Sequence, residues 1–183
     1  MDRVLRRLVV PMLAIAALAA CNRDAPEPPP DFSSSSKPPS AASSGAALET
    51  ELLRVYSGHV AAVVAASTAS DYEHPELAKY IGDPLLGSVK TNIRENQRRG
   101  AVRTGTIGST PRVTKVDLNG KPAQAAVEDC FDTTNYRLVY PGLGNSQAPP
   151  ANPARYPVAA TLWRYDDGRW LVTEAKADRS RSC

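Results

Sequence analysis

The feature that most constrains this chain is the contrast between its first 47 residues and the remainder. Residues 22–47 carry six prolines and seven serines, with almost no large apolar side chain. A segment of this composition cannot bury enough apolar surface to offset the conformational entropy lost on folding. We expect a disordered tether here, although an O-glycosylated or partner-binding segment fits the same composition. Folding is therefore confined to residues 48–183, a length typical of one domain.

Residues 1–21 have the pattern of a targeting segment. Three arginines precede the apolar run 8–18, which is too short to span a bilayer as a helix. The run ends in Leu18-Ala19-Ala20-Cys21, which resembles the bacterial lipobox, whose cysteine is diacylglycerated and becomes the first residue of the mature protein. The resemblance implies an extracytoplasmic protein anchored to the outer face of the cell membrane by a lipid on Cys21. The general secretory route is favoured over twin-arginine export, and an ordinary secretory signal with an incidental cysteine is the alternative.

Charge excludes one class of partner. The formal net charge is +3, and loss of the first 20 residues would remove three arginines and one aspartate. No concentrated basic footprint of the kind that binds nucleic acid remains. Lys90, Arg94 and Arg98 recur every four residues, with Arg99 and Arg103 following, and this basic stripe could meet anionic lipid or wall phosphate. A solvated helix face, with Glu95 pairing to a neighbouring arginine, is the favoured interpretation.

Hydrophobic periodicity predicts helices first and strands afterwards. Apolar residues at three- and four-residue steps predict an amphipathic helix over residues 48–66. A short second helix is expected over residues 75–80. A third helix is expected to begin at Asp83, as N-cap, with Pro84 in its first turn, and to stop at Gly100.

The strands expected after Gly100 are bounded by turn signals, of which Asn119-Gly120 and Asp167-Gly168 predict tight hairpins. Residues 141–153 are expected to form a long loop rich in proline and glycine. The order of elements predicts an α+β fold, with N-terminal helices packed on a curved antiparallel sheet built as a meander. The six predicted strands are residues 101–107, 111–118, 123–132, 136–140, 156–165 and 169–177.

Four segments carry a family resemblance, and they cover much of residues 48–183. They are residues 71–80, which include His74-Pro75-Glu76-Leu77, then 87–100, 127–132 and 167–172. Together they resemble small secreted lipoproteins of actinobacteria in the nuclear-transport-factor-two-like (SnoaL-like, cystatin-like cone) superfamily. The resemblance implies a cone-like α+β fold more strongly than it implies any activity, because one fold hosts many functions.

Two cysteines remain once Cys21 is lipidated. Cys130 lies in a predicted strand and Cys183 at the terminus, and an extracytoplasmic compartment is oxidising, so we expect a disulfide. A redox or metal role for the two thiols is the alternative, but there is no Cys-x-x-Cys and no histidine near either in sequence. The sequence predicts neither a metal site nor a cofactor.

Candidate acid–base residues are few. His59 falls one turn after Tyr56 and could point into the cone interior, where the resemblance implies that superfamily enzymes place such groups. A core histidine is the commoner outcome, so the two residues are pocket candidates only, and no catalytic residue is assigned. His74 is expected to shape the start of the second helix. Asp129 and Asp132 are three positions apart, so they should point to opposite faces of one strand and act at a sheet edge or turn.

The expected function is a binding or accessory domain of the bacterial cell envelope, anchored by its lipid and without enzymatic activity. The alternatives are a small-molecule enzyme of isomerase or hydrolase type using the cone pocket, and a protein-docking module of an envelope assembly. A ligand-sized pocket lined by His59 and a buried carboxylate would favour the enzyme. A filled cone with a large exposed apolar sheet face would favour docking. The ligand, the envelope partner and the oligomeric state stay open.

Overall fold

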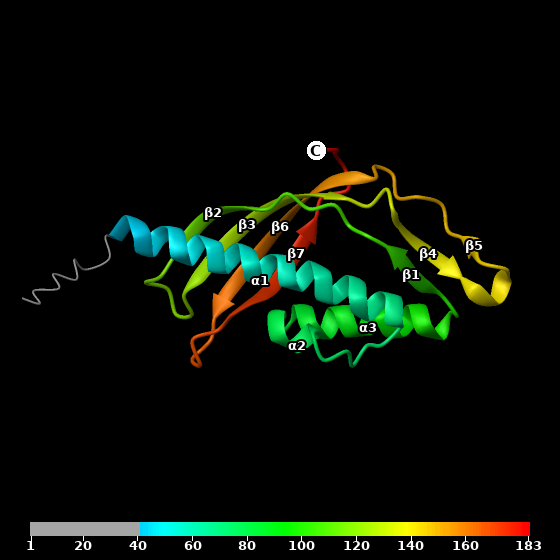
Figure 1. Ribbon diagram of the computed structural model, residues 1–183, viewed down its shortest axis with the longest axis horizontal. Coiled ribbons are helices and arrows are strands. Elements are labelled where there is room, and N and C mark those ends of the chain that lie inside the picture. The colour runs from blue at the N-terminus through cyan, green and yellow to red at the C-terminus, as the bar shows by residue number, and fades with distance from the viewer. Residues whose placement is uncertain (1–40) are drawn as a thin grey trace, which may run out of the picture. The chain divides into compact units, whose positions relative to one another are not determined.

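The computed structural model of the chain describes residues 41–183. The expected targeting segment, Cys21 and most of the expected tether lie outside these residues. The described part is an α+β domain, as predicted, with helices α1 (Ala41–Ala69), α2 (Leu77–Tyr80) and α3 (Leu85–Arg98) ahead of all the strands. Figure 1 shows α1 running lengthwise across the strands, with α2 and α3 beside its C-terminal half.

All six predicted strands are present, and the bounds differ from the predicted ones by three residues at most. A seventh, two-residue strand and a short 3-10 helix (Pro141–Leu143) lie within the region predicted to be a long loop. The strands are β1 (Val102–Gly105), β2 (Arg112–Asp117), β3 (Gln124–Asp132), β4 (Tyr136–Tyr140), β5 (Ser146–Gln147), β6 (Arg155–Arg164) and β7 (Trp170–Ala177).

The strands form two antiparallel sheets, which corrects the expectation of one meander. One sheet has the order β2-β3-β6-β7 and the other β1-β4-β5, so β3 pairs with β6 and not with β4. The chain leaves the first sheet at Thr133, whose backbone N–H and side-chain hydroxyl both donate to the carbonyl of Ala154, at 2.9 and 2.8 Å. The turn that follows, closed by the Tyr136 N–H on the Thr133 carbonyl at 3.0 Å, directs β4 to β1. Both predicted hairpins, β2–β3 and β6–β7, are present.

The first helix is longer than its predicted range, residues 48–66. It begins at Ala41, inside the range expected for the tether, and residues 44–47 are exposed. Alanines at 41, 42, 46 and 47 favour helix without any packing partner. Of the described helices, only the segment Ser44–Ala69 is long and apolar enough to cross a membrane. Its large apolar side chains pack against the sheets and the other helices, as in a core helix.

The core has two parts. The first lies between α1 and the four-stranded sheet, and the second between the three helices. Alternate residues of β3 and β6 point into the first part, as the period of a strand requires. Its fully buried members include Leu52, Tyr56, Val127 and Leu162, and the second part contains Ala66, Leu77, Ile81 and Ile93.

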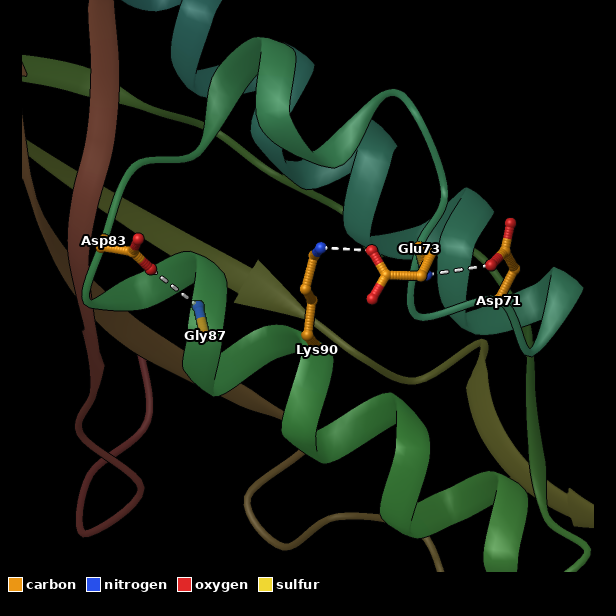
Figure 2. Close-up of polar contacts among 5 residues, drawn as sticks. All are labelled: Asp71, Glu73, Asp83, Gly87 and Lys90. Carbon is orange, nitrogen blue, oxygen red and sulfur yellow. Dashed lines mark hydrogen bonds and ion pairs between the residues drawn. The ribbon is translucent and has the colours of Figure 1, made fainter.

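The predicted third helix begins one residue later than expected. Pro84 takes the cap position that was expected for Asp83, although the Asp83 carboxylate still accepts a hydrogen bond from the Gly87 N–H at 3.2 Å (Figure 2). Gly100, with φ of +63°, follows the helix end in the left-handed conformation that glycine favours.

The basic stripe on α3 is largely ion-paired or stacked, as the solvated-face interpretation expects. Lys90 pairs with Glu73, whose backbone N–H donates to Asp71 at 2.9 Å (Figure 2). Arg98 pairs with Glu95 at 2.8 Å, and the Arg94 guanidinium lies 4.3 Å from the centre of a tyrosine ring. Lys90 and Arg98 are therefore neutralised by carboxylates, as expected for a solvated helix face.

Candidate functional site

The two pocket candidates belong to a polar cluster sealed in the core. Tyr56 and His59 of α1 are 0% and 5% exposed, and their ring centroids lie 5.5 Å apart. The carboxylate of Asp129, on β3, is close enough to both rings to influence their titration, and Asp129 is itself 5% exposed. The structure therefore brings together a tyrosine, a histidine and an aspartate that the sequence did not connect.

Asp129 is held by hydrogen bonds from the segment between β1 and β2. Its carboxylate accepts the Ser109 hydroxyl at 2.5 Å and the Thr110 backbone N–H at 2.6 Å. The prediction of a role at a sheet edge or turn is wrong for this residue, because its strand position points inward with Ala125 and Val127. For Asp132 it is right, since that carboxylate accepts the Thr134 N–H at 2.9 Å in the turn after β3.

Burial fixes the protonation states of the cluster. Loss of hydration lowers the pKa of His59 to about 4, against a smaller opposing effect from the nearby Tyr56 backbone and Asp129. Loss of hydration, with the Asp129 charge second, raises the pKa of Tyr56 well above its usual range. At neutral pH the imidazole and the phenol are both uncharged. Among the described residues, the Tyr56 hydroxyl and His59 Nδ1 have no hydrogen-bond partner, although the Asp129 carboxylate lies near.

A polar cavity lies elsewhere, where the second sheet meets α1 and the C-terminal tail. Its volume is about 430 Å³, which lies within the usual range for small-molecule sites. Arginines and aromatic rings dominate its walls, and no aspartate or glutamate of the described residues lines it. The residues that line it include Val63, Ser67, Arg103, Ile107, Phe131, Thr133, Tyr136, Arg137, Pro149, Pro150, Tyr156 and Arg179.

A second cavity, of about 460 Å³, is mainly apolar and lies between α1 and the segment joining β1 to β2. Ser109 is one of its lining residues, but the hydroxyl of Ser109 is engaged by Asp129. Tyr56, His59 and Asp129 line neither of these two cavities. The acid–base groups are thus separated from the spaces where a substrate could bind.

The cysteines form the expected disulfide. Cys130 and Cys183 are joined at 2.07 Å across 53 residues, and the bond ties the C-terminal tail to β3. The same tail carries Arg179, so the disulfide also holds one wall of the polar cavity. His74 accepts the Glu76 N–H on Nδ1 at 3.3 Å, which fits its expected part at the start of α2. Within residues 41–183, no group of three or more histidine, cysteine, aspartate or glutamate side chains could hold a metal ion.

Of the arginines of the polar cavity, Arg103 was predicted only as the end of the basic stripe that follows the third helix, and Arg137 and Arg179 have no sequence signal of their own. Arg103 and Arg137 come from neighbouring strands of the second sheet, and Arg179 comes from the tail. Only the pairing of β1 with β4, which the predicted meander did not contain, brings the first two together. The sequence predicted one part of the cavity wall, because the proline-rich loop that it indicated supplies Pro149 and Pro150.

Comparison with known proteins finds no family model that matches the chain. It also finds no matching curated protein sequence. Among solved structures, the chain is similar to the intermembrane-space region of the chloroplast protein ARC6, with 13% identity, a TM-score of 0.47, and coverage of 70% of this chain and 95% of that one. A protein of Catenulispora acidiphila is similar at 18% identity and a TM-score of 0.41, covering 74% of this chain and 93% of that one. A structure from the same organism in complex with S-DNPA has 18% identity and a TM-score of 0.41, with coverage of 72% and 92%. The likeness concerns the fold alone.

Proposed function

We propose that this chain is a lipid-anchored, extracytoplasmic domain of the bacterial cell envelope that binds a small ligand without transforming it. The observation that carries the binding role is the open polar cavity of about 430 Å³. Its position apart from the sealed Tyr56, His59 and Asp129 cluster argues against catalysis, because a general acid or base must come within hydrogen-bond reach of its substrate. Membership of the SnoaL-like group remains a proposal that rests on the sequence segments quoted above.

The docking alternative has less support from the surface. The large apolar side chains exposed within residues 41–183 are Val116, Leu118, Leu143 and Tyr165. Val116 lies on β2, Leu118 in the turn after it, Tyr165 in the turn after β6 and Leu143 in the 3-10 helix, so Leu143 is remote in sequence from the other elements. A docking surface of the kind expected from a filled cone needs a contiguous apolar patch.

The binding role is tested with the full chain purified in detergent. A panel of small neutral, cationic and anionic aromatic molecules is titrated while backbone amide signals are followed by NMR. We expect shifts at cavity residues such as Thr133 and Tyr136, with little change at Val127 in the sealed core. If no molecule of the panel shifts the cavity signals, the binding role is wrong.

The anchor is tested separately by Cys21→Ser, expressed in a bacterial host fed with labelled palmitate. We expect the label to be absent and the protein to leave the detergent-extracted membrane fraction, because two acyl chains on one cysteine supply stable anchoring. Ser43→Ala, a change in the same N-terminal region, serves as the control and should retain the label. Incorporation of label into Cys21→Ser would contradict the lipobox assignment.

A further inference from the structure

The polar cavity contains cationic groups that the fold does not neutralise. Arg103, Arg137 and Arg179 line it, and none of them forms an ion pair with a described carboxylate. Some other arginines of the domain are paired, since Arg98, Arg112, Arg169 and Arg181 each have a carboxylate partner within 2.8 Å. Guanidinium groups around a cavity that lacks acidic side chains give it a positive potential.

Two of the three guanidinium groups are oriented by stacking on tyrosine rings. Arg179 lies 4.0 Å from the ring centre of Tyr156 and donates to its hydroxyl at 2.9 Å. Arg103 lies 5.2 Å from the ring centre of Tyr136. Stacking engages the face of a guanidinium and leaves N–H groups at its edge for an oxyanion. Two arginines held in this way lose less side-chain freedom when a ligand binds.

Tyr136 adds a neutral donor. Its hydroxyl is buried and makes no hydrogen bond within the described residues, although Ser67 and Arg103 lie close enough to influence it. Burial raises the pKa of this tyrosine, so the hydroxyl keeps its proton at physiological pH. A buried hydroxyl without a partner is uncommon, and a ligand oxygen in the cavity could accept a hydrogen bond from it.

The remaining walls suit an apolar body. Val63, Ile107, Phe131, Pro149 and Pro150 border the same space, so an oxyanion bound by the arginines would carry its carbon skeleton against apolar side chains. An inorganic ion would leave these walls in contact with water. The combination of charge, donor and apolar wall is typical of sites for small organic ligands.

From these contacts we infer that the cavity binds an organic anion, namely a carboxylate or phosphate group on an apolar body, with Arg103 and Arg179 as its cationic ligands. The inference rests on the proposed binding role and specifies its ligand class. The same chemistry is offered by a free metabolite and by the headgroup of an anionic lipid at the membrane where the domain is proposed to be anchored.

The probes are phenyl phosphate, benzoate and the uncharged benzyl alcohol, titrated by calorimetry and NMR into the full chain in detergent. We expect both anions to bind at least tenfold more tightly than the alcohol, and more weakly as salt is added. Arg103→Gln and Arg179→Gln should each weaken anion binding roughly tenfold, since a charge-assisted hydrogen bond contributes about that much. Arg98→Gln is the matched control, because it removes the same charge from an ion-paired site on α3, and it should leave binding unchanged.

A lipid arm separates the two sources. Cys21→Ser is mixed with vesicles of phosphatidylcholine alone or with phosphatidylglycerol added. A headgroup ligand is supported if the protein binds the anionic vesicles, and if Arg103→Gln weakens this binding while Arg98→Gln does not. A free anion is supported if only the soluble probes bind. Equal affinity for anions and benzyl alcohol would overturn the anion inference and leave the binding role intact. Failure of all probes and vesicles to bind would overturn both.

Discussion

The sealed cluster and the arginine cavity both gather titratable side chains, but they differ in access and in partners. In the cluster, the Asp129 carboxylate accepts two short hydrogen bonds and its neighbours Tyr56 and His59 are uncharged at neutral pH. In the cavity, Arg103 and Arg179 are charged, have no carboxylate partner among residues 41–183 and border open space. The polar groups of the cluster interact within the protein, whereas the arginines of the cavity are free to interact with a ligand.

The comparison shows that a strongly shifted pKa does not identify a functional site unless a ligand can reach the group. Perturbed titration also arises where polar groups are simply buried. The pKa of His59 is lowered mainly by lost hydration, and His59 lines neither the polar cavity nor the apolar one described above. The cavity residues Arg103 and Arg179, by contrast, border open space and meet the geometric conditions for binding.

The largest effect should follow loss of the disulfide, which joins the two regions. Cys130 follows Asp129 on β3, and its bond to Cys183 closes a separation of 53 residues. Chain entropy predicts a loss of about 4 kcal/mol for a loop of this length. Cys130→Ser should lower the melting temperature by several degrees, and anion binding should weaken because Arg179 is no longer held by its tail.

Cys183→Ser provides the control, since it breaks the same bond from the other end and should give the same melting temperature. A non-reducing digest of the native protein should contain one linked peptide with both cysteines. Two free, alkylatable thiols in native protein would contradict the disulfide and restore a redox or metal role for the pair.

The second largest effect should come from the sealed cluster. Asp129→Ala leaves the Ser109 hydroxyl and the Thr110 N–H without their acceptor in a buried site. Stranded donors of this kind cost about 3 kcal/mol in total. Thermal unfolding should show the loss, while anion binding in the cavity should be retained by the folded fraction.

Asp132→Ala is the matched control, because its carboxylate lies at the exposed end of the same strand and accepts one backbone hydrogen bond in a turn. We expect a much smaller change in melting temperature. Equal destabilisation by the two substitutions would mean that the Asp129 contacts do not stabilise the fold, and the division into a structural cluster and a binding cavity would fail.

Local patterns predicted most of the fold, because the signals involved are short-range. Alternation located the six strands, Asn119-Gly120 and Asp167-Gly168 located two hairpins, and the count of cysteines indicated the disulfide. The division into two sheets was missed because it depends on Thr133 bonding to Ala154, a contact between residues far apart in the chain.

The candidate site was harder to predict because it also depends on contacts between residues that are far apart in the chain. The inward position of Asp129 follows from strand alternation, but its burial depends on α1 covering that face. Arg103 and Arg179 lie at opposite ends of the strand region and meet the same cavity only after both sheets and the tail are in place. An isolated arginine in a sequence has no periodicity that would distinguish it from a solvated one.

A smaller effect should appear when pH is lowered. His59 has an unfolded pKa near its ordinary value of 6.5 and a folded pKa of about 4, so the unfolded chain binds its proton first. Stability from this residue is therefore unaffected above pH 6.5 and falls as pH drops toward 4. Between pH 7 and pH 5 the loss is on the order of 2 kcal/mol.

Denaturant unfolding at several pH values measures this loss, with His59→Gln as the comparison because glutamine does not titrate. The variant should show a flatter profile from pH 7 to pH 5. The exposed carboxylates with lowered pKa, such as Asp132 and Asp178, lose their contributions at lower pH, around and below their ordinary value of 3.8. An unchanged slope in His59→Gln would mean that the imidazole is hydrated in the folded state.

The smallest effect should be found at the cavity, and it tests the comparison most directly. Arg137 lines the cavity and makes no ion pair with a described carboxylate, so Arg137→Gln removes no identified salt bridge. It also removes one of three like charges that face the same space. We expect a change in unfolding free energy within about 0.5 kcal/mol, with any gain largest at low salt, where repulsion is least screened. A loss of unfolding free energy as large as that of Asp129→Ala would show that Arg137 stabilises the fold and is not free to bind a ligand. Groups that bind ligands commonly contribute nothing to the stability of a fold or reduce it. We expect this of the cavity arginines, whereas Asp129 should stabilise the fold.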